Sequence, residues 1–173
     1  PFGCGSSVVG GIEPRVGNNF SSVITIDMRK MNKVLEVDKI SRAARIQAGA
    51  LGPQLEAGLK SNGLTLRHFP QSFEFSTLGG WIATRSSGMQ SDKYGNIEDM
   101  VLSLKMVTPA GEIKTVDVPR HSIGFSMKDL LALIVLLWLR ALDRDQKIGI
   151  YCSDIAGAFD RVSVDKLYAK CLR

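Results

Sequence analysis

Apolar and polar residues alternate over short stretches in the first two thirds of the chain, a pattern typical of short strands. Val23–Asp27 is a β-branched run, Lys33–Asp38 alternates, and Ala44–Ala48 is a third short segment of the same kind. Each of the three is predicted as a strand. Leu64–His68 lies further along and is predicted as a short return strand.

One helix is predicted between these strands, near Pro53–Ser61. Leu51, Leu55 and Leu59 recur at every fourth position, which places them on one face of a helix. The proline at the start suits a first helical turn, and Gly63 follows the last turn as a stop signal.

The residues that follow predict a β-hairpin. Val101–Thr108 and Glu112–Val116 are predicted strands, and a Pro-Ala-Gly sequence between them supplies the turn. Helix and strands therefore mix without the regular alternation that a doubly wound sheet requires. The predicted fold class is α+β.

The chain changes character near residue 124. Ser126 is a candidate N-cap for a helix that runs to about Leu142. Ile148–Ser153 is then a predicted strand and Ser163–Leu172 a second helix. We therefore divide the chain into residues 1–124 and an unrelated helix–strand–helix tail, residues 125–173.

The composition fits an ordinary globular protein and gives no strong signal for a partner. The chain has 173 residues and a net charge of +5, with Lys and Arg scattered singly among the acids. No basic stripe results, so no nucleic-acid partner is expected. The apolar run Leu130–Leu139 is shorter than the ~20 residues that a bilayer requires and is interpreted as a buried helix.

Cysteine and histidine give little support for a disulfide framework or a metal site. Cys4, Cys152 and Cys171 are odd in number and form no C-x-x-C pair, so reduced thiols in an intracellular compartment are expected. His68 and His121 stand alone in the sequence, which argues against a metal site.

The segment Pro1–Gly11 is rich in glycine and serine. Glycine permits close approach of the backbone and positive φ, and consecutive N–H groups in such a loop form a concavity that holds an anion. Val8 stands where a Rossmann fingerprint has its third glycine, and the Gly-Lys-Ser/Thr of a P-loop is missing. Taken alone, the segment is also explained by a plain turn.

The segment Phe69–Met89 adds hydroxyl groups and a cation. Its serine and threonine hydroxyls are suited to hydrogen bonds with a phosphate or with the edge of a heterocycle. The positive charge of Arg85 is suited to balance the negative charge of a phosphate. Trp81 fits a core position better than a cofactor platform. Glu74 fits a structural or solvated acid better than a catalytic one.

Three stretches together carry a resemblance to a known family: PFGCGSSVVGG at residues 1–11, QSFEFSTLGGWIATRSSGM at 71–89, and YGNIEDMVLSLKMVTPAGEI at 94–113. They resemble the FAD-binding domain of the alkylglycerone-phosphate synthases (alkyl-dihydroxyacetone-phosphate synthases) of ether-lipid biosynthesis. These enzymes belong to the flavoproteins typified by vanillyl-alcohol oxidase. The resemblance covers residues 1–124 and implies a partial domain of that type, in which FAD lies between two α+β subdomains.

The resemblance implies FAD as the cofactor and three groups of contacts. Pro1–Ser7 would wrap the diphosphate, while Gln71–Thr77 and Thr84–Ser87 would contact the rest of the dinucleotide and approach the flavin. The implied residues are Pro1, Phe2, Gly3, Cys4, Gly5, Ser6, Ser7, Gln71, Ser72, Phe73, Glu74, Phe75, Ser76, Thr77, Thr84, Arg85, Ser86 and Ser87.

The chain departs from the family pattern at three of these positions. Cys4 stands where the family usually has glycine, Ser6 replaces the usual threonine, and Gln71 replaces the usual aspartate. Family members that tether FAD covalently through the first segment use a histidine there. None is present, so dissociable FAD is implied.

The resemblance also implies an activity. It is the exchange of the acyl chain of acyl-dihydroxyacetone phosphate for a fatty alcohol, without net redox change. A peroxisomal location, peripheral association with a membrane and a homodimer are implied in the same way. The third cofactor segment and the catalytic segments of the family have no match, so no catalytic residue is assigned. We expect weak FAD binding or none, and no turnover.

The tail carries a second, shorter resemblance. YCSDIAGAFDRVSVDKL at 151–167 resembles the first catalytic motif of retroelement reverse transcriptases, with Asp154 as a metal ligand at a strand end and Phe159 beside the incoming sugar. Two-metal phosphoryl transfer needs further carboxylates, which the tail lacks, so polymerase activity is not expected. A chimeric product without activity of its own is the alternative to the flavoprotein interpretation.

Overall fold

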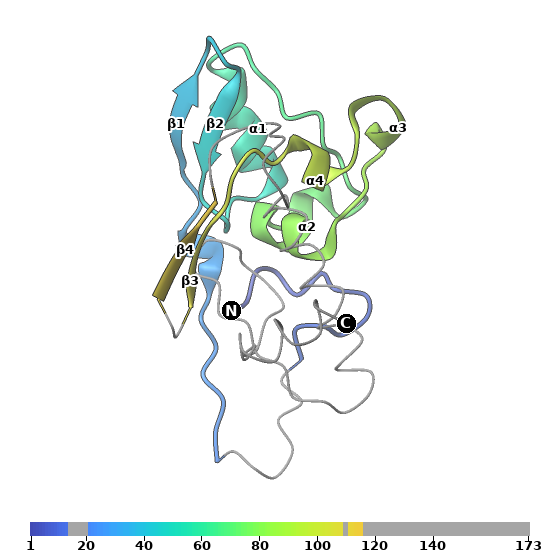
Figure 1. Cartoon of the computed structure of the whole chain (residues 1–173). Coiled ribbons are helices and arrows are strands. Elements are labelled where there is room, and N and C mark those ends of the chain that lie inside the picture. Colours follow the sequence, from blue (N-terminus) through green and yellow to red (C-terminus); the bar gives the residue numbers. More distant parts are fainter. Residues whose placement is uncertain (14–20, 109–110, 116–173) are drawn as a thin grey trace, which may run out of the picture.

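Two antiparallel hairpins and several short helices make up the computed structural model, which describes residues 1–13, 21–108 and 111–115. Figure 1 shows the first hairpin beside helix α1, with α2 and α4 packed together and the second hairpin below. The mixture of helices with two small sheets is the α+β class predicted from the sequence.

The first hairpin consists of β1 (Val34–Asp38) and β2 (Ala43–Ile46). Val34 pairs with Ile46 at the open end, and Asp38 pairs with Ala43 at the turn. The Asp38 carboxylate accepts hydrogen bonds from the Ile40 amide at 2.9 Å and from the Ser41 hydroxyl. These donors lower the pKa of Asp38 and fix the turn. Both predicted strands are confirmed, to within two residues at their ends.

Helix α1 (Gly52–Lys60) confirms the predicted helix. The Leu51 amide donates to the side-chain oxygen of Gln54 at 3.2 Å, so one free N–H at the helix start is satisfied. At the other end Gly63 adopts φ +74°, and the Leu64 amide donates to the Leu59 carbonyl at 3.1 Å. This closing bond with a left-handed glycine is the usual end of a helix.

The core joins this helix to the segments that follow it. The buried side chains are Ala50, Leu55, Leu59, Leu78, Trp81 and Ile97. Val34 of β1 packs against the cluster, and a Cβ on Gly58 would lie 2.7 Å from its methyl group. The absence of a side chain at Gly58 therefore allows α1 to lie directly on the hairpin.

The second hairpin consists of β3 (Lys105–Thr108) and β4 (Gly111–Lys114). Its register is continuous from the Lys105–Lys114 pair to the Thr108–Gly111 pair. The Thr115 hydroxyl accepts a hydrogen bond from the Leu104 amide at 2.7 Å, which extends the pairing by one residue. The predicted hairpin is confirmed with shorter strands.

Two predicted strands are wrong. Val23–Asp27 has no strand partner among the described residues except Phe2, whose amide donates to the Ile26 carbonyl at 2.8 Å. Leu64–His68 forms no ladder because Arg67 adopts φ +63°, which breaks an extended run. β-branched and apolar composition predicted both strands, but a strand also needs a partner along its length.

Short helices were missing from the sequence prediction. They are α2 (Leu78–Thr84), α3 (Ser91–Tyr94), α4 (Ile97–Met100) and two single 3₁₀ turns, Met28–Lys30 and Phe73–Phe75. Helix α2 contains Gly79 and Gly80, which lower helix propensity and hide the pattern. Tertiary burial of Leu78 and Trp81 stabilises it instead.

The elements predicted after residue 124 lie outside the described residues, as does the division into residues 1–124 and 125–173. In the described ranges, the helices are all too short or too polar to cross a bilayer.

Replacement of Leu55 by alanine should lower the free energy of unfolding by about 2–5 kcal/mol, since this side chain is 1% exposed in the core and would leave a cavity. Lys60→Ala, at an exposed position of the same helix, should change stability by no more than about 0.5 kcal/mol. Urea unfolding followed by circular dichroism measures both. Equal effects would show that α1 does not face the core as described.

Candidate cofactor site

The first segment forms a loop that is held to the molecule at Phe2. The Phe2 amide donates to the Ile26 carbonyl, and the Met28 amide donates to the Phe2 carbonyl at 2.9 Å. Gly5 follows with φ +72°, a conformation that side-chain-bearing residues avoid. The backbone N–H groups of residues 3–6 donate to no other described residue. The loop therefore offers consecutive donors without a partner in the described ranges, as an anion-holding concavity requires.

The two glycine-rich segments meet at Gly3 and Thr77. Gly3 is buried, and a Cβ built on it would lie 2.8 Å from the Thr77 Oγ1 atom. Real Cβ atoms do not approach oxygen so closely, so glycine at this position is what permits the contact. Pro1–Ser7 and Gln71–Thr77 therefore approach each other at this pair of residues.

The second segment is anchored by backbone bonds to the residues before α1. The Leu78 amide donates to the Ala50 carbonyl at 2.9 Å, and the Gly79 amide donates to the Ala48 carbonyl at 2.8 Å. Thr77 is 2% exposed and caps α2, because its Oγ1 accepts from the Gly80 amide at 3.3 Å. The position of Thr77 against Gly3 is therefore fixed from two sides.

Ser76 is fully occupied by internal hydrogen bonds. Its Oγ atom lies 2.5 Å from the indole Nε1 of Trp81, 3.0 Å from the Ser72 hydroxyl and 2.7 Å from the Ser72 carbonyl. A hydroxyl has one donor and two acceptor sites, so these three bonds saturate it. Trp81 is itself 2% exposed and stacks with Phe73 at a centroid distance of 6.1 Å. The core position expected for Trp81 is confirmed.

The third group, Thr84–Ser87, forms the turn that ends α2. Arg85 adopts φ +50° there, and its guanidinium pairs with Glu98 at 2.8 Å. The Ser86 hydroxyl lies 2.8 Å from His68 Nε2, and the Ser87 hydroxyl donates to the Asn96 side chain at 2.8 Å. The polar side chains of this turn are therefore committed largely to internal partners.

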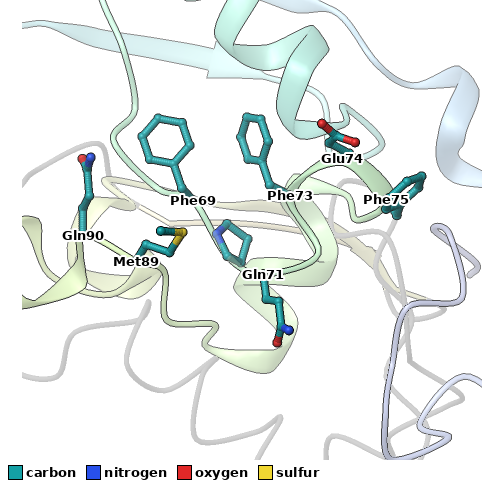
Figure 2. A pocket seen from close by; sticks show the side chains of 8 residues that line it. Phe69, Gln71, Phe73, Glu74, Phe75, Met89 and Gln90 are labelled. Carbon is teal, nitrogen blue, oxygen red and sulfur yellow. The ribbon is translucent and has the colours of Figure 1, made fainter.

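A hollow of about 620 Å³ opens beside the second segment. Figure 2 shows the Phe69 and Phe73 rings projecting in the same direction, with Gln90 and Met89 on one side and Glu74 and Phe75 on the other. The ring centroids of Phe69 and Phe73 are 5.2 Å apart. Gln71 also lines the hollow but points away from the two rings in Figure 2.

The predicted site residues do not line one common hollow, and the third group, Thr84–Ser87, lies at the turn that ends α2. Gly3 and Thr77 lie in contact, whereas Gln71, Phe73, Glu74 and Phe75 line the hollow. No residue of the first segment belongs to that lining. Sequence reasoning missed the contribution of Phe69, Met89 and Gln90, because the hollow forms where Phe69 meets residues twenty positions along the chain, which no local pattern signals.

An arginine beside the first segment was also missed. Arg29 lies 5.8 Å from the Phe2 ring centroid and forms a two-pronged ion pair with Asp27, with distances of 2.9 and 2.6 Å. These bonds lower the pKa of Asp27 to about 2. Partial burial raises the pKa of the nearby Cys4 thiol, so the thiol stays protonated at neutral pH.

Comparison with known proteins decides the family. The model of the family described as "FAD binding domain" matches residues 1–117. The chain belongs to this FAD-binding domain family. FAD is therefore its cofactor, and the predicted fold of the vanillyl-alcohol oxidase type is confirmed for the matched residues.

The similar proteins include synthases of one kind. The chain is 51% identical over 131 residues to the alkyldihydroxyacetonephosphate synthase of Dictyostelium discoideum, covering 76% of this chain and 21% of that protein. The Trypanosoma brucei brucei synthase is 46% identical over 66% of this chain and 19% of its own length. A solved synthase structure matches with a TM-score of 0.69 and 51% identity, over 76% of this chain and 23% of that one. The chain spans about a fifth of the length of the curated relatives it matches.

Replacement of Ser76 by alanine should lower the free energy of unfolding by about 1–3 kcal/mol, because the buried indole N–H of Trp81 would lose its acceptor. In a Trp81→Phe background the same replacement should cost less, since no indole N–H remains to be satisfied. Urea unfolding followed by circular dichroism gives the four stabilities of the cycle. Strictly additive losses would contradict the Ser76–Trp81 hydrogen bond.

Proposed function

We propose that the loop Pro1–Ser7 holds the diphosphate of FAD and that Gln71–Thr77 and Thr84–Ser87 approach the rest of the cofactor. The observation that carries this proposal is the contact of Gly3 with Thr77, which brings the first two groups together. A plain turn would explain the glycines of the first segment, but not the burial of Gly3 against the Thr77 hydroxyl of the second.

The residues present fit the diphosphate of FAD. Phosphate oxygens accept hydrogen bonds, and residues 3–6 offer consecutive backbone donors that no other described residue uses. The left-handed conformation of Gly5 allows such donors to curve around an anion. Family membership points to the same cofactor. The isoalloxazine of bound FAD supplies the redox and covalent chemistry, and the protein supplies binding and orientation.

The roles of the individual residues differ in this proposal. Ser6 is exposed, so its hydroxyl is open to the cofactor. The hydroxyl oxygen of the half-buried Ser7 accepts a hydrogen bond from the Gly11 amide at 3.1 Å, so Ser7 contributes mainly by closing the loop. Ser76 contributes through its backbone, because its hydroxyl is saturated. Arg85 contributes a partly neutralised charge, since Glu98 pairs with it.

For the protein as a whole we propose alkyldihydroxyacetonephosphate synthase activity. Support comes from the 46–51% identity to two such synthases and from the solved synthase structure. The substrates would be acyl-dihydroxyacetone phosphate and a fatty alcohol. A peroxisomal location, peripheral membrane association and a homodimer form part of the same proposal. We assign no catalytic residue among the described ones, and for the 173-residue chain on its own we expect weak FAD binding at most, without turnover when both lipids are supplied.

Gly5→Ala should weaken FAD binding by about tenfold, because alanine at φ +72° costs about 1–2 kcal/mol and shifts the loop out of its binding conformation. The matched control is Gly63→Ala, which has φ +74° and open space around it, far along the chain from the loop. It carries the same backbone strain but should leave FAD affinity unchanged.

Flavin fluorescence anisotropy, recorded while protein is added to a fixed FAD concentration, measures all three affinities. Equal affinity of the parent chain and Gly5→Ala would remove the first segment from the cofactor site. Equal weakening in both variants would mean that general destabilisation, not the loop, governs binding.

A further inference from the structure

We propose that His68 is a positioning residue for the cofactor site. Its imidazole holds the Ser86 hydroxyl and thereby fixes the turn Thr84–Ser87 that the proposed function assigns to FAD. The effect on FAD binding rests on the proposed function, whereas the contact between His68 and Ser86 is present without the cofactor. Neither the family nor the sequence reasoning assigns a role to His68, which stood out only as an isolated histidine.

The imidazole lies in a closed position between two segments. His68 is 1% exposed, and its Nε2 atom is 2.8 Å from the Ser86 hydroxyl oxygen. The ring packs against Trp81 with a centroid distance of 5.2 Å and an interplanar angle of 58°. A buried polar ring that is packed on one side and bonded on another has one orientation available, so it can fix the partner it contacts.

The backbone on both sides of His68 reinforces this contact. The Met89 amide donates to the Phe69 carbonyl at 2.9 Å. A Cβ on Gly88 would lie 2.8 Å from the Phe69 nitrogen, so the absence of a side chain at Gly88 lets the two backbone segments come into contact. The loop that carries His68 is therefore seated directly on the residues that follow the turn.

Ser86 is the residue through which the turn is held. Its amide donates to the Trp81 carbonyl at 2.9 Å, and its carbonyl accepts from the Ile97 amide at 3.3 Å. Arg85, next to it, is held in the left-handed conformation that ends α2. Loss of the imidazole would free the Ser86 side chain, because it removes the hydrogen bond between His68 and Ser86 and leaves the two backbone bonds of Ser86. The expected effect is on orientation, since His68 itself lies behind the turn and not on its surface.

The charges around His68 favour its neutral form. Burial lowers the pKa of His68 below its usual 6.5, and Glu98 of α4 opposes this shift. Arg85, at the end of α2, pairs with Glu98, and Arg67, on the same loop, faces the Tyr94 ring. His68 Nδ1 has no hydrogen-bond partner among the described residues. A proton added there would be a buried charge without an acceptor.

The sign of the pH effect follows from the lowered pKa. The unfolded chain binds a proton at His68 below about 6.5, while the folded chain resists protonation until a lower pH. The stabilisation is therefore complete above pH 6.5 and is lost as pH falls below it. The fold around the neutral imidazole should therefore lose stability as the pH falls below 6.5.

The first test needs no cofactor. His68→Phe keeps a ring against Trp81 but cannot bond Ser86, whereas His68→Gln places an amide nitrogen near the position of Nε2. Amide hydrogen exchange measured by mass spectrometry should increase in peptides covering residues 84–89 for His68→Phe. It should return close to the parent level for His68→Gln, and α1 should be unaffected in both. Unchanged exchange at 84–89 in His68→Phe, or an increase spread over the whole chain, would overturn the proposal.

The second test measures FAD affinity by flavin anisotropy. His68→Phe should weaken binding several-fold, His68→Gln should restore most of it, and Ser86→Ala should add little to His68→Phe because both remove one bond. Additive losses would contradict action through Ser86. If the parent chain binds no FAD, the proposed function fails, and the exchange experiment still decides whether His68 holds the turn.

The third test uses pH in a His121→Gln background, since His121 also titrates. The free energy of unfolding should fall as the pH drops below 6.5 in the parent and fall less in His68→Gln, which has nothing to protonate. Identical pH profiles for the two proteins would show that His68 does not carry this dependence and would overturn the buried neutral imidazole.

Discussion

The close approach of backbone segments around Gly49 is the constraint on which the rest of the structure depends. A Cβ at this position would lie 1.8 Å from the Met28 carbonyl oxygen, so no other residue fits. The Gly49 amide donates to the Met31 carbonyl at 2.8 Å, and Ala48 and Ala50 on either side accept from the start of α2. Met28 in turn is bonded to Phe2. Both candidate cofactor segments are therefore placed by one short stretch of chain whose small residues let backbones touch.

The buried hydroxyl groups of the second segment form hydrogen bonds inside the protein. Thr77 caps a helix, Ser76 joins Trp81 to Ser72, and Ser86 bonds to His68. A sequence rich in serine and threonine suggests direct phosphate contacts, yet each of these side chains has an internal partner that explains it. In the proposed site, direct contact with the cofactor would then be left mainly to backbone donors and to the exposed hydroxyl of Ser6. Positioning and binding are thus divided between the two segments.

Local sequence patterns correctly predicted the elements that depend mainly on residues near one another in the chain. The alternation of apolar and polar residues predicted β1, and leucines at every fourth position predicted α1. The Pro-Ala-Gly sequence predicted the turn of the second hairpin. Helix α2 escaped because its glycines weaken propensity and its stability comes from burial of Trp81. The contact of Gly3 with Thr77 joins residues far apart in sequence, which no periodicity can reveal. The resemblance to a family supplied that convergence, but not the saturation of Ser76 or the hollow lined by Phe69 and Phe73.

The charges beside the two candidate cofactor segments are already balanced by ion pairs within the protein. The arginine near each segment is already paired: Arg29 with Asp27 at 2.6 Å and Arg85 with Glu98 at 2.8 Å. An arginine that is paired with a carboxylate attracts a diphosphate less strongly than an unpaired arginine does. The charge of the ligand must then be met by peptide dipoles, which act only over short distances and only in the correct geometry. Affinity therefore depends on the shape of the loop, and the shape depends on the glycines and on the buried bonds that hold the second segment against it.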